Sequence, residues 1–302
     1  MQSSLQFSLV LGTVGRTDEL GRMLDSLCRQ THRNFEVILV DQNPGPELDD
    51  LRASYDSRIA IRHVRARRGL SRARNVGLRF AGGDIIGFPD DDCWYEPDLL
   101  ARVAAQLERN PSWSAVTGRA IMPSGEPSSG RWDPRSGLVS RANIWRRAIS
   151  FSMFFRRDAI RRCRFDESLG VGAGTPWGAG EETDFLLQLL AQGGQIHYDP
   201  ALTVFHPEWG KGPYTPAIRT KARSYGRGIG RVLRKHNFPL TQVGYHLIRP
   251  LGGSVLSWAA WRPDKARYHW AIFAGRTSGW LSSDPPEPDC GTLPSEEDPL
   301  AG

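Results

Sequence analysis

The chain has 302 residues, 39 % of them hydrophobic, which is long enough for one large α/β domain or for one domain with an appendage. Its formal net charge is +6, but six of the 33 acidic side chains and none of the 39 basic ones lie in residues 281–302. The preceding 280 residues are therefore strongly basic, which indicates anionic partners such as phosphates, nucleic acid or an anionic membrane face.

Composition and hydropathy exclude several classes of protein. The four cysteines, at positions 28, 93, 163 and 290, lack any metal-ligand spacing and argue for a reducing compartment rather than a disulfide framework. No run reaches the roughly 18 apolar residues of a spanning helix, and residues 1–6 lack the apolar core of a signal peptide. We therefore expect a protein of the cytoplasm.

The first ninety residues alternate between short apolar runs and segments with helical spacing of apolar side chains. The expected strands cover residues 7–11, 35–40, 59–64 and 84–88, and the expected helices cover residues 18–28 (capped by Thr17), a short stretch after Pro46, and residues 70–80. This alternation predicts a parallel sheet with right-handed crossovers. Thr13, Asp41 and residues 90–92 then share one edge of the sheet.

Three consecutive carboxylates, Asp90, Asp91 and Asp92, follow the fourth strand. Adjacent carboxylates repel one another, so a fold holds them together only when a cation compensates. A hard divalent cation that carries a nucleotide diphosphate satisfies this requirement. The alternative interpretation is a solvated acidic turn before the helix that begins near Glu96.

An arginine-rich segment lies between these acids and the third strand. Most of its arginines fit a solvated helix face, but Arg68 and Arg74 flank a helix start, where the positive end of the helix assists phosphate binding. A nucleic-acid site is disfavoured because the segment lacks stacking aromatic residues.

The next hundred residues predict a helix, further strands and two loops. We expect a helix at 96–110 with Pro97 in its first turn, a strand at 114–121, a mobile Gly/Pro/Ser-rich loop or lid at 123–137, a strand at 149–155, and two short strands at 195–198 and 202–205. Five glycines between residues 170 and 180 give a loop that can approach a ligand closely. Glu181 and Glu182 follow it and open a helix, a position that the helix dipole alone also favours.

The C-terminal third is basic and rich in aromatic residues. Residues 214–236, 247–261 and 268–280 are expected to be helical, and their tryptophans and arginines suit either packing on the preceding domain or contact with an anionic membrane surface. The expected domains are residues 1–210, a basic amphipathic helical region at 211–280, and a disordered acidic, proline-rich tail at 281–302.

Several ordered motifs in residues 6–207 resemble glycosyltransferase family 2. They are residues 8–13 with Arg16, residues 37–43 (VILVDQN), residues 69–77 (GLSRARNVG), residues 88–92 (FPDDD), residues 165–167 (FDE) and residues 180–185 (GEETDF). The resemblance implies a GT-A fold: an α/β nucleotide-binding domain with a mostly parallel central sheet flanked by helices, here followed by a C-terminal helical appendage. It also implies an inverting, metal-dependent enzyme that uses a UDP- or dTDP-linked sugar and a glycan or lipid-linked acceptor. As the arginine-rich segment already indicates, we expect no nucleic-acid partner.

The resemblance further implies roles for individual residues. Asp41 would accept the N3–H of the donor base, Asp92 and His206 would ligate Mg²⁺ or Mn²⁺, and Asp90 would serve both ribose and metal. Glu182 would be the general base, with Glu181 beside it. Beyond these roles, we expect donor binding at Thr13, Arg16, Arg68, Arg74 and Asp91. We expect the acceptor side at Trp177 and Asp184, with Trp132 and the loop at 123–137 as further candidates.

Three positions depart from the family pattern: Gln42 and Cys93 replace acids, and Glu182 is one methylene longer than the usual Asp, so either Glu181 or Glu182 is the base. Two other functions compete with glycosyl transfer. A nucleotidyltransferase shares the acidic α/β site but needs a better phosphate loop than residues 12–16, and intact acids argue against a non-catalytic binding module. The sequence fixes neither the donor sugar nor the acceptor.

Overall fold

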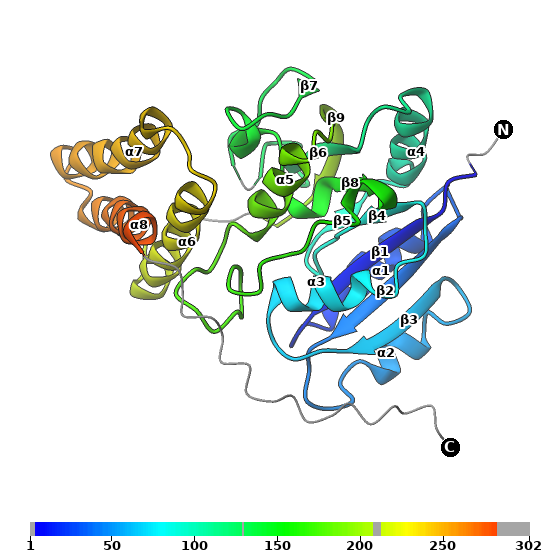
Figure 1. Ribbon diagram of the computed structural model, residues 1–302. Helices are drawn as coiled ribbons and strands as arrows, with labels where there is room; N and C mark the ends of the chain where they lie inside the picture. Colours follow the sequence, from blue (N-terminus) through cyan, green and yellow to red (C-terminus); the bar gives the residue numbers. More distant parts are fainter. Residues whose placement is uncertain (1–3, 129, 208–212, 283–302) are drawn as a thin grey trace, which may run out of the picture.

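The computed structural model describes residues 4–128, 130–207 and 213–282 (Figure 1). A mixed α/β domain with a central sheet makes up most of the molecule, and three long helices stand together at one side of it (Figure 1). All but the first two residues of the expected acidic tail, 281–302, lie outside the described residues.

The N-terminal half of the sheet is parallel, as the alternating pattern predicts. Its strands lie in the order β3-β2-β1-β4, and each pairs in parallel with its neighbour. The elements are β1 (Phe7–Thr13), α1 (Asp18–Cys28), β2 (Phe35–Asp41), α2 (Asp49–Ala53), β3 (Ala60–Arg65), α3 (Leu70–Leu78) and β4 (Ile85–Gly87). The carboxyl ends of β1, β2 and β4 therefore meet at one edge, where Thr13 pairs with Asp41 and Gly12 bridges to Asp90.

The second half of the sheet is mixed, because β8 pairs antiparallel to both β4 and β6. Strand β9 then pairs with β6 in parallel and with β5 and β7 in antiparallel. The elements are β5 (Trp94–Tyr95), α4 (Leu99–Arg109), β6 (Ala115–Ile121), β7 (Gly137–Leu138), η1 (Ile144–Arg146), η2 (Ser150–Ser152), β8 (Met153–Arg156), η3 (Arg157–Ile160), α5 (Glu181–Ala191) and β9 (Ile196–Phe205).

Helices cover both faces of the sheet, and alternate strand residues feed the two cores. On β1, Phe7, Leu9 and Leu11 pack with α1 and α4, whereas Val10 packs on the opposite face with α3 and α5. Because this two-residue alternation buries both faces of the sheet, the strand sequences are continuous apolar runs.

Several expected element boundaries are wrong. The two strands expected at 195–205 form one strand, because a bulge between β6 and β9 accommodates Pro200, which has no N–H to donate. The bulge lies opposite Gly118, where any Cβ would overlap the backbone of Leu202. The strand expected from residue 149 begins at Met153 after a 3₁₀ turn.

The start of α4 also differs from the expectation, and one expected cap makes no hydrogen bond. Helix α4 begins at Leu99, so Pro97 precedes it instead of occupying its first turn. Thr17 stands at the N-cap of α1, but its side chain makes no capping hydrogen bond. Boundaries of this kind are decided by packing of the apolar face more than by end signals.

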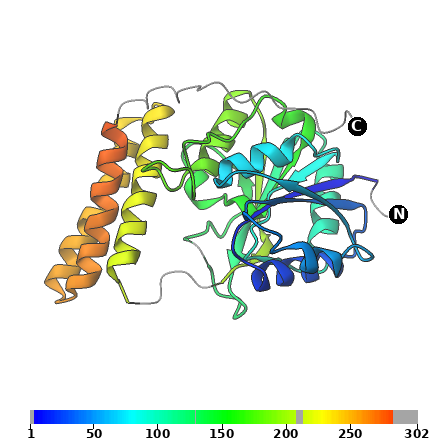
Figure 2. The ribbon, with the colours of Figure 1, turned by 90° about the horizontal axis from the view of Figure 1, so that it is seen from below.

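The C-terminal helices are α6 (Pro216–Lys235), α7 (Leu240–Ala259) and α8 (Pro263–Leu281). Helix α6 is nearest to the sheet domain, and α7 and α8 lie side by side beyond it (Figure 2). Contacts of α8 with α6 near Gly226 and Gly230, and with α7 near Ser254, join the three helices into one group. None of the described helices is both long and apolar enough to cross a bilayer.

Candidate active site

A cavity of about 1100 Å³ opens where the sheet edge meets α5 and α6. The carboxyl ends of β1 and β4 supply Thr13 and the acid triplet, and the loop after β9 supplies His206. Glu181 and Glu182 enter from the start of α5. Open α/β folds bind their ligands at the carboxyl edge of a parallel sheet, which is where this cavity lies.

Each member of the acid triplet has a cationic partner. Arg74 Nη2 donates to Asp90 Oδ1 at 2.9 Å. Arg16 Nη1 lies 2.7 Å from both Asp91 Oδ1 and Asp92 Oδ2, and the hydroxyl of Thr13 donates to Asp91 Oδ2 at 2.7 Å. These contacts supply the compensating charge that three adjacent carboxylates require.

The surroundings of the triplet shift the pKa values of its members differently. Burial raises the pKa of Asp90 to about 6, with Arg74 opposing the shift and the other two acids adding to it. Burial also acts to raise the pKa of Asp92, but the hydrogen bond and charge of His206, together with Arg16, outweigh it and the pKa is lowered. Asp92 is therefore the acid of the triplet best suited to remain ionised.

Asp92 and His206 form the pair that fits a metal ion. Asp92 Oδ1 lies 3.4 Å from His206 Nε2. Burial acts to lower the pKa of His206, but the hydrogen bond and charge of Asp92 raise it overall. Within the described residues no three His, Cys, Asp or Glu side chains converge on one point. A carboxylate and an imidazole nevertheless suit Mn²⁺ or Mg²⁺ when phosphate oxygens and water complete the coordination shell.

Glu181 and Glu182 both line the cavity but differ in burial. Glu181 is buried, and its Oε1 lies 3.4 Å from Nη1 of the fully buried Arg74. Burial, followed by the charge of Glu182, raises the pKa of Glu181 well above its usual range. Glu182 is only partly buried and lines the cavity. Gly180, left-handed at φ 98°, turns the chain into α5 and directs this pair inward.

Arg74 connects the two acidic groups. It is the largest fully buried side chain among the described residues, and it contacts both Asp90 and Glu181. The sequence predicts that Arg74 contacts phosphate. Its guanidinium instead lies behind the cavity wall, between the carboxylates of Asp90 and Glu181. Arg68 does line the cavity.

Asp41 lies at the expected sheet edge but is fully buried. Its Oδ1 accepts hydrogen bonds from the backbone and side-chain nitrogens of Asn43, both at 2.8 Å, and its Oδ2 is 3.0 Å from His63 and 3.2 Å from Arg65. The neighbouring Gln42, instead, lines the cavity. The base-binding role of Asp41 stays a prediction.

Of the three residues expected on the acceptor side, Trp132 lines the cavity, whereas Trp177 and Asp184 do not. Trp177 is buried, with the Arg231 guanidinium 5.1 Å from its ring centroid. Asp184 is fully buried, and its Oδ1 lies 2.8 Å from Lys235 Nζ and 2.7 Å from His236 Nε2. Two residues beyond Glu182 on a helix, Asp184 points away from the cavity and joins α5 to the end of α6.

Helix α6 supplies cavity residues that the motifs did not indicate. Lys221 and Tyr225 line the cavity from one helical face, and Ile218 and Ile229 lie on the same face. Burial lowers the pKa of Lys221, with a further contribution from nearby Arg16, and burial raises the pKa of Tyr225 to about 12. The signal in the sequence was the spacing of these four side chains along an otherwise basic helix.

The fold, the acidic sheet edge and the cavity define an α/β domain of the glycosyltransferase type. Residues 8–164, just over half of the chain, match the Glycosyl transferase family 2 profile. The chain therefore belongs to glycosyltransferase family 2.

Similar proteins agree with this assignment. The chain is 33 % identical over 105 residues to an uncharacterized glycosyltransferase of Haemophilus influenzae, and over 155 residues to a PGL/p-HBAD biosynthesis glycosyltransferase of Mycobacterium tuberculosis. These segments cover 35 % and 50 % of this chain, and only 35 % and 59 % of the respective relatives.

Solved structures with 15 % identity share the fold. The mannosyltransferase PcManGT from Pyrobaculum calidifontis, in complex with GDP-Man and Mn²⁺, has a TM-score of 0.66 over 92 % of this chain and 87 % of that one. Residues 1–349 of S. aureus TarS, in complex with UDP-GlcNAc, give a TM-score of 0.57 over 91 % of each chain. These likenesses support the GT-A type of α/β fold.

Proposed function

We propose that the chain transfers a sugar from a nucleoside-diphosphate sugar to a hydroxyl group of a glycan or lipid-linked acceptor, with inversion at the anomeric carbon. The observation that carries the proposal is the convergence of Asp92, His206 and Glu182 on one cavity with the cations Arg16 and Lys221. In this combination the cations can stabilise a diphosphate leaving group, and a carboxylate can act as a general base on the acceptor. The UDP or dTDP identity of the donor rests on the family resemblance around Asp41.

Glu182 is the proposed general base. It lines the cavity at the start of α5, and it takes the proton of the acceptor hydroxyl as that oxygen attacks the anomeric carbon. Glu181 is less suited, because burial and the charge of Glu182 raise its pKa and favour its neutral form. A single in-line displacement by the acceptor oxygen inverts the anomeric centre.

The leaving diphosphate lies on the opposite side of the proposed reaction centre. Arg16, Arg68 and Lys221 line the cavity and offset the negative charge that develops on the departing phosphate. A divalent ion held by Asp92 and His206 would supply Lewis-acid stabilisation of the same charge. Arg74 is a positioning residue in this scheme, because it contacts Asp90 and Glu181 and not the cavity.

The test is sugar release or transfer from a panel of UDP-, dTDP- and GDP-linked sugars with Mn²⁺, using the purified protein and two matched variants. Glu182→Gln should lower transfer by about 100-fold or more while donor affinity changes little, because the amide cannot accept the proton. Glu181→Gln, one position away, should retain most activity. The reverse pattern would assign the base to Glu181, and a wild-type protein that turns over none of the panel would contradict the proposal.

A further inference from the structure

The outward side of α7 is an apolar stripe. Ile248 and Leu256 are 68 % and 71 % exposed, and Trp261, just beyond the helix, is 92 % exposed. Nine of the twelve exposed large hydrophobic side chains among the described residues belong to α7, α8 and their connection. Those nine are Leu240, Tyr245, Ile248, Val255, Leu256, Trp258, Trp261, Trp270 and Leu281. Such a concentration marks an interaction surface, since isolated exposed apolar residues are otherwise scattered.

The opposite side of α7 already has its packing partner. Ser254 donates to the carbonyl oxygen of Ala266, and Arg276 donates to that of His246, so the inner face of α7 rests on α8. Positions 245, 248, 252, 255 and 256 follow helical spacing and lie on the outer face. The stripe is therefore a second apolar face of the helix, and the described part of the chain leaves it exposed.

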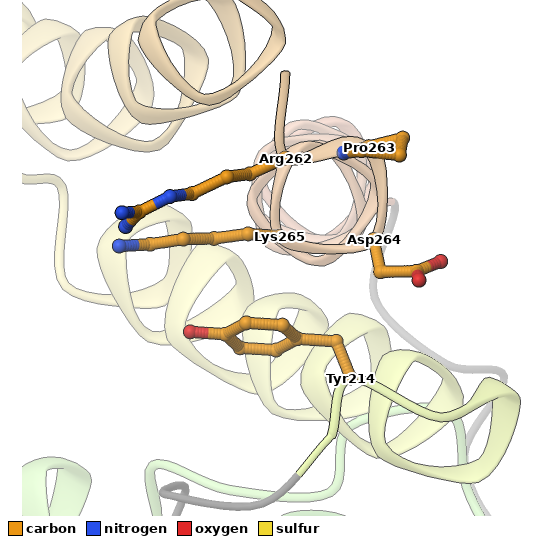
Figure 3. Close-up of a pocket in the computed structure, with 5 residues that line it drawn as sticks. All are labelled: Tyr214, Arg262, Pro263, Asp264 and Lys265. Atoms are coloured by element: carbon orange, nitrogen blue, oxygen red, sulfur yellow. The ribbon is translucent and has the colours of Figure 1, made fainter. Parts of the chain in front are cut away.

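Basic side chains border this stripe. Helix α7 contains Arg249 and no acidic residue. The connection into α8 adds Arg262, Lys265 and Arg267 against a single acid, Asp264. Figure 3 shows Arg262 and Lys265 extending side by side above the ring of Tyr214, while Asp264 points the other way. A pocket of about 300 Å³ is lined by Tyr214, Arg262, Pro263, Asp264 and Lys265.

The basic corner adjoins the proposed active site. Tyr214 lines both the small pocket and the large cavity, and its ring lies 4.9 Å from that of Tyr268, which also lines the cavity. A surface that engaged the corner would therefore lie close to one border of the cavity.

We propose that the outer stripe of α7, with the corner formed by Trp261, Arg262 and Lys265, docks on the surface of an anionic lipid bilayer, with lipid phosphate bound between Arg262 and Lys265. Apolar side chains bordered by cations match the boundary between acyl chains and anionic headgroups. Exposed tryptophans prefer that same depth. Docking of two copies through the same stripe would bring like basic borders together, which opposes association.

Vesicle flotation of the full chain tests the proposal without any donor or acceptor, so its result is independent of the proposed reaction. The protein should float with vesicles of phosphatidylcholine and phosphatidylglycerol, remain unbound with phosphatidylcholine alone, and lose binding as salt increases. Arg262→Glu with Lys265→Glu should weaken partitioning by roughly 30-fold or more. The matched control, Arg161→Glu with Arg162→Glu, makes the same charge change at two exposed residues after β8 and should bind like the wild type, apart from the general effect of net charge.

A second pair of variants tests the apolar part. Ile248→Asp with Leu256→Asp should abolish flotation, whereas Leu138→Asp, at an exposed apolar residue on β7, should not. If the aspartate variant fails to fold, Trp261→Phe serves instead, because the exposed Trp261 contributes little to folding. This variant should lose part of the fluorescence quenching by brominated anionic lipids.

Three outcomes would overturn the proposal: no wild-type binding to anionic vesicles, unchanged binding in both the charge and the apolar variants, or a stable dimer in sedimentation that Ile248→Asp with Leu256→Asp dissociates while vesicle binding is absent. The last outcome would assign the stripe to a second copy of the chain.

Discussion

The carboxylates of Asp90, Asp91 and Asp92 are adjacent in sequence but have different partners. Asp91 is held by Thr13 and Arg16, Asp90 by Arg74, and Asp92 by Arg16 and His206. Only Asp92 therefore pairs a carboxylate with an imidazole at the cavity wall. This separation by partner, within three residues, gives each carboxylate a different electrostatic environment.

Asp92→Asn should weaken binding of Mn²⁺ by more than about tenfold, because the substitution keeps the shape of the side chain and removes the charge that would bind the cation in the proposed site. Mn²⁺ binding measured by electron paramagnetic resonance, with and without UDP, checks this. Asp91→Asn is the matched control, since Thr13 and Arg16 already occupy that carboxylate. Equal Mn²⁺ affinity in Asp92→Asn and wild type would remove Asp92 from the metal site.

The burial of Glu181 also predicts how the free energy of unfolding depends on pH. Its folded-state pKa is raised above the ordinary value of 4.5, chiefly by burial and then by Glu182, so folding favours its neutral form. Above about pH 4.5 the unfolded chain releases this proton, whereas the folded chain keeps it. Glu181 therefore lowers the free energy of unfolding of the wild type as the pH rises, by up to about 1.4 kcal/mol per pH unit. This loss ends once the pH passes the folded-state pKa.

Glu181→Gln carries no titrating proton at this position. Between about pH 5 and pH 8, its free energy of unfolding should therefore rise relative to that of the wild type. Urea denaturation at both pH values measures the difference. Two curves that stay parallel across this range would show that Glu181 is ionised in the folded protein.

Among the elements, α6 and α8 approach each other through glycines. Gly226 and Gly230 of α6 face α8, and Gly275 and Gly279 of α8 face α6. A Cβ at Gly226 would lie 2.8 Å from the carbonyl oxygen of Ile272, which is closer than van der Waals contact allows. The short distance between these backbones fixes the position of α6 and of the cavity residues it carries.

Gly226→Val should therefore destabilise the protein by about 1–3 kcal/mol through overpacking, measured by thermal or urea unfolding. Gly244→Ala in α7 is the control, because a Cβ there meets nothing within 4 Å. It should be neutral or stabilising by up to about 1 kcal/mol. A Gly226→Val protein as stable as the wild type would mean that α6 and α8 can separate without cost.

Across the whole molecule, α6 is shared between the sheet domain and the C-terminal helices. One face lines the cavity with Lys221 and Tyr225, another packs on α8, and its C-terminal end is held to α5 by Asp184. The division expected near residue 210 separates segments of sequence, whereas the proposed site takes residues from both sides of it.

Asp184→Ala should test this connection. The fully buried Asp184 contacts Lys235, His236 and Gln188. Its loss leaves His236 without this carboxylate, while Lys235 keeps its contact with Asp166, so we expect a cost of about 2–3 kcal/mol after allowance for the partial exposure of Lys235. Because α6 also lines the cavity, donor affinity measured by calorimetry should fall together with the free energy of unfolding. Asp158→Ala removes an exposed partner of Arg161 and should change neither property. Lost stability with unchanged donor affinity would separate α6 from the site.

The sequence by itself determined the order of strands and helices in the first half, the parallel pairing of β1 to β4, and the edge at which the acids meet. It did so because apolar periodicity and strand ends are local signals, and the carboxyl ends of parallel strands share one edge. The family motifs lie in the same segments.

Only the tertiary structure decided which side chains reach the cavity. Arg74 and Asp184 lie in family motifs, and Trp177 lies in the glycine-rich loop before α5. Their side chains are nevertheless buried among partners distant in sequence, namely Glu181, Lys235 and Arg231. Lys221 and Tyr225 reach the cavity because close packing on α8 and the contact with α5 set the position of α6. The direction of a side chain depends on such long-range packing, which no local pattern encodes.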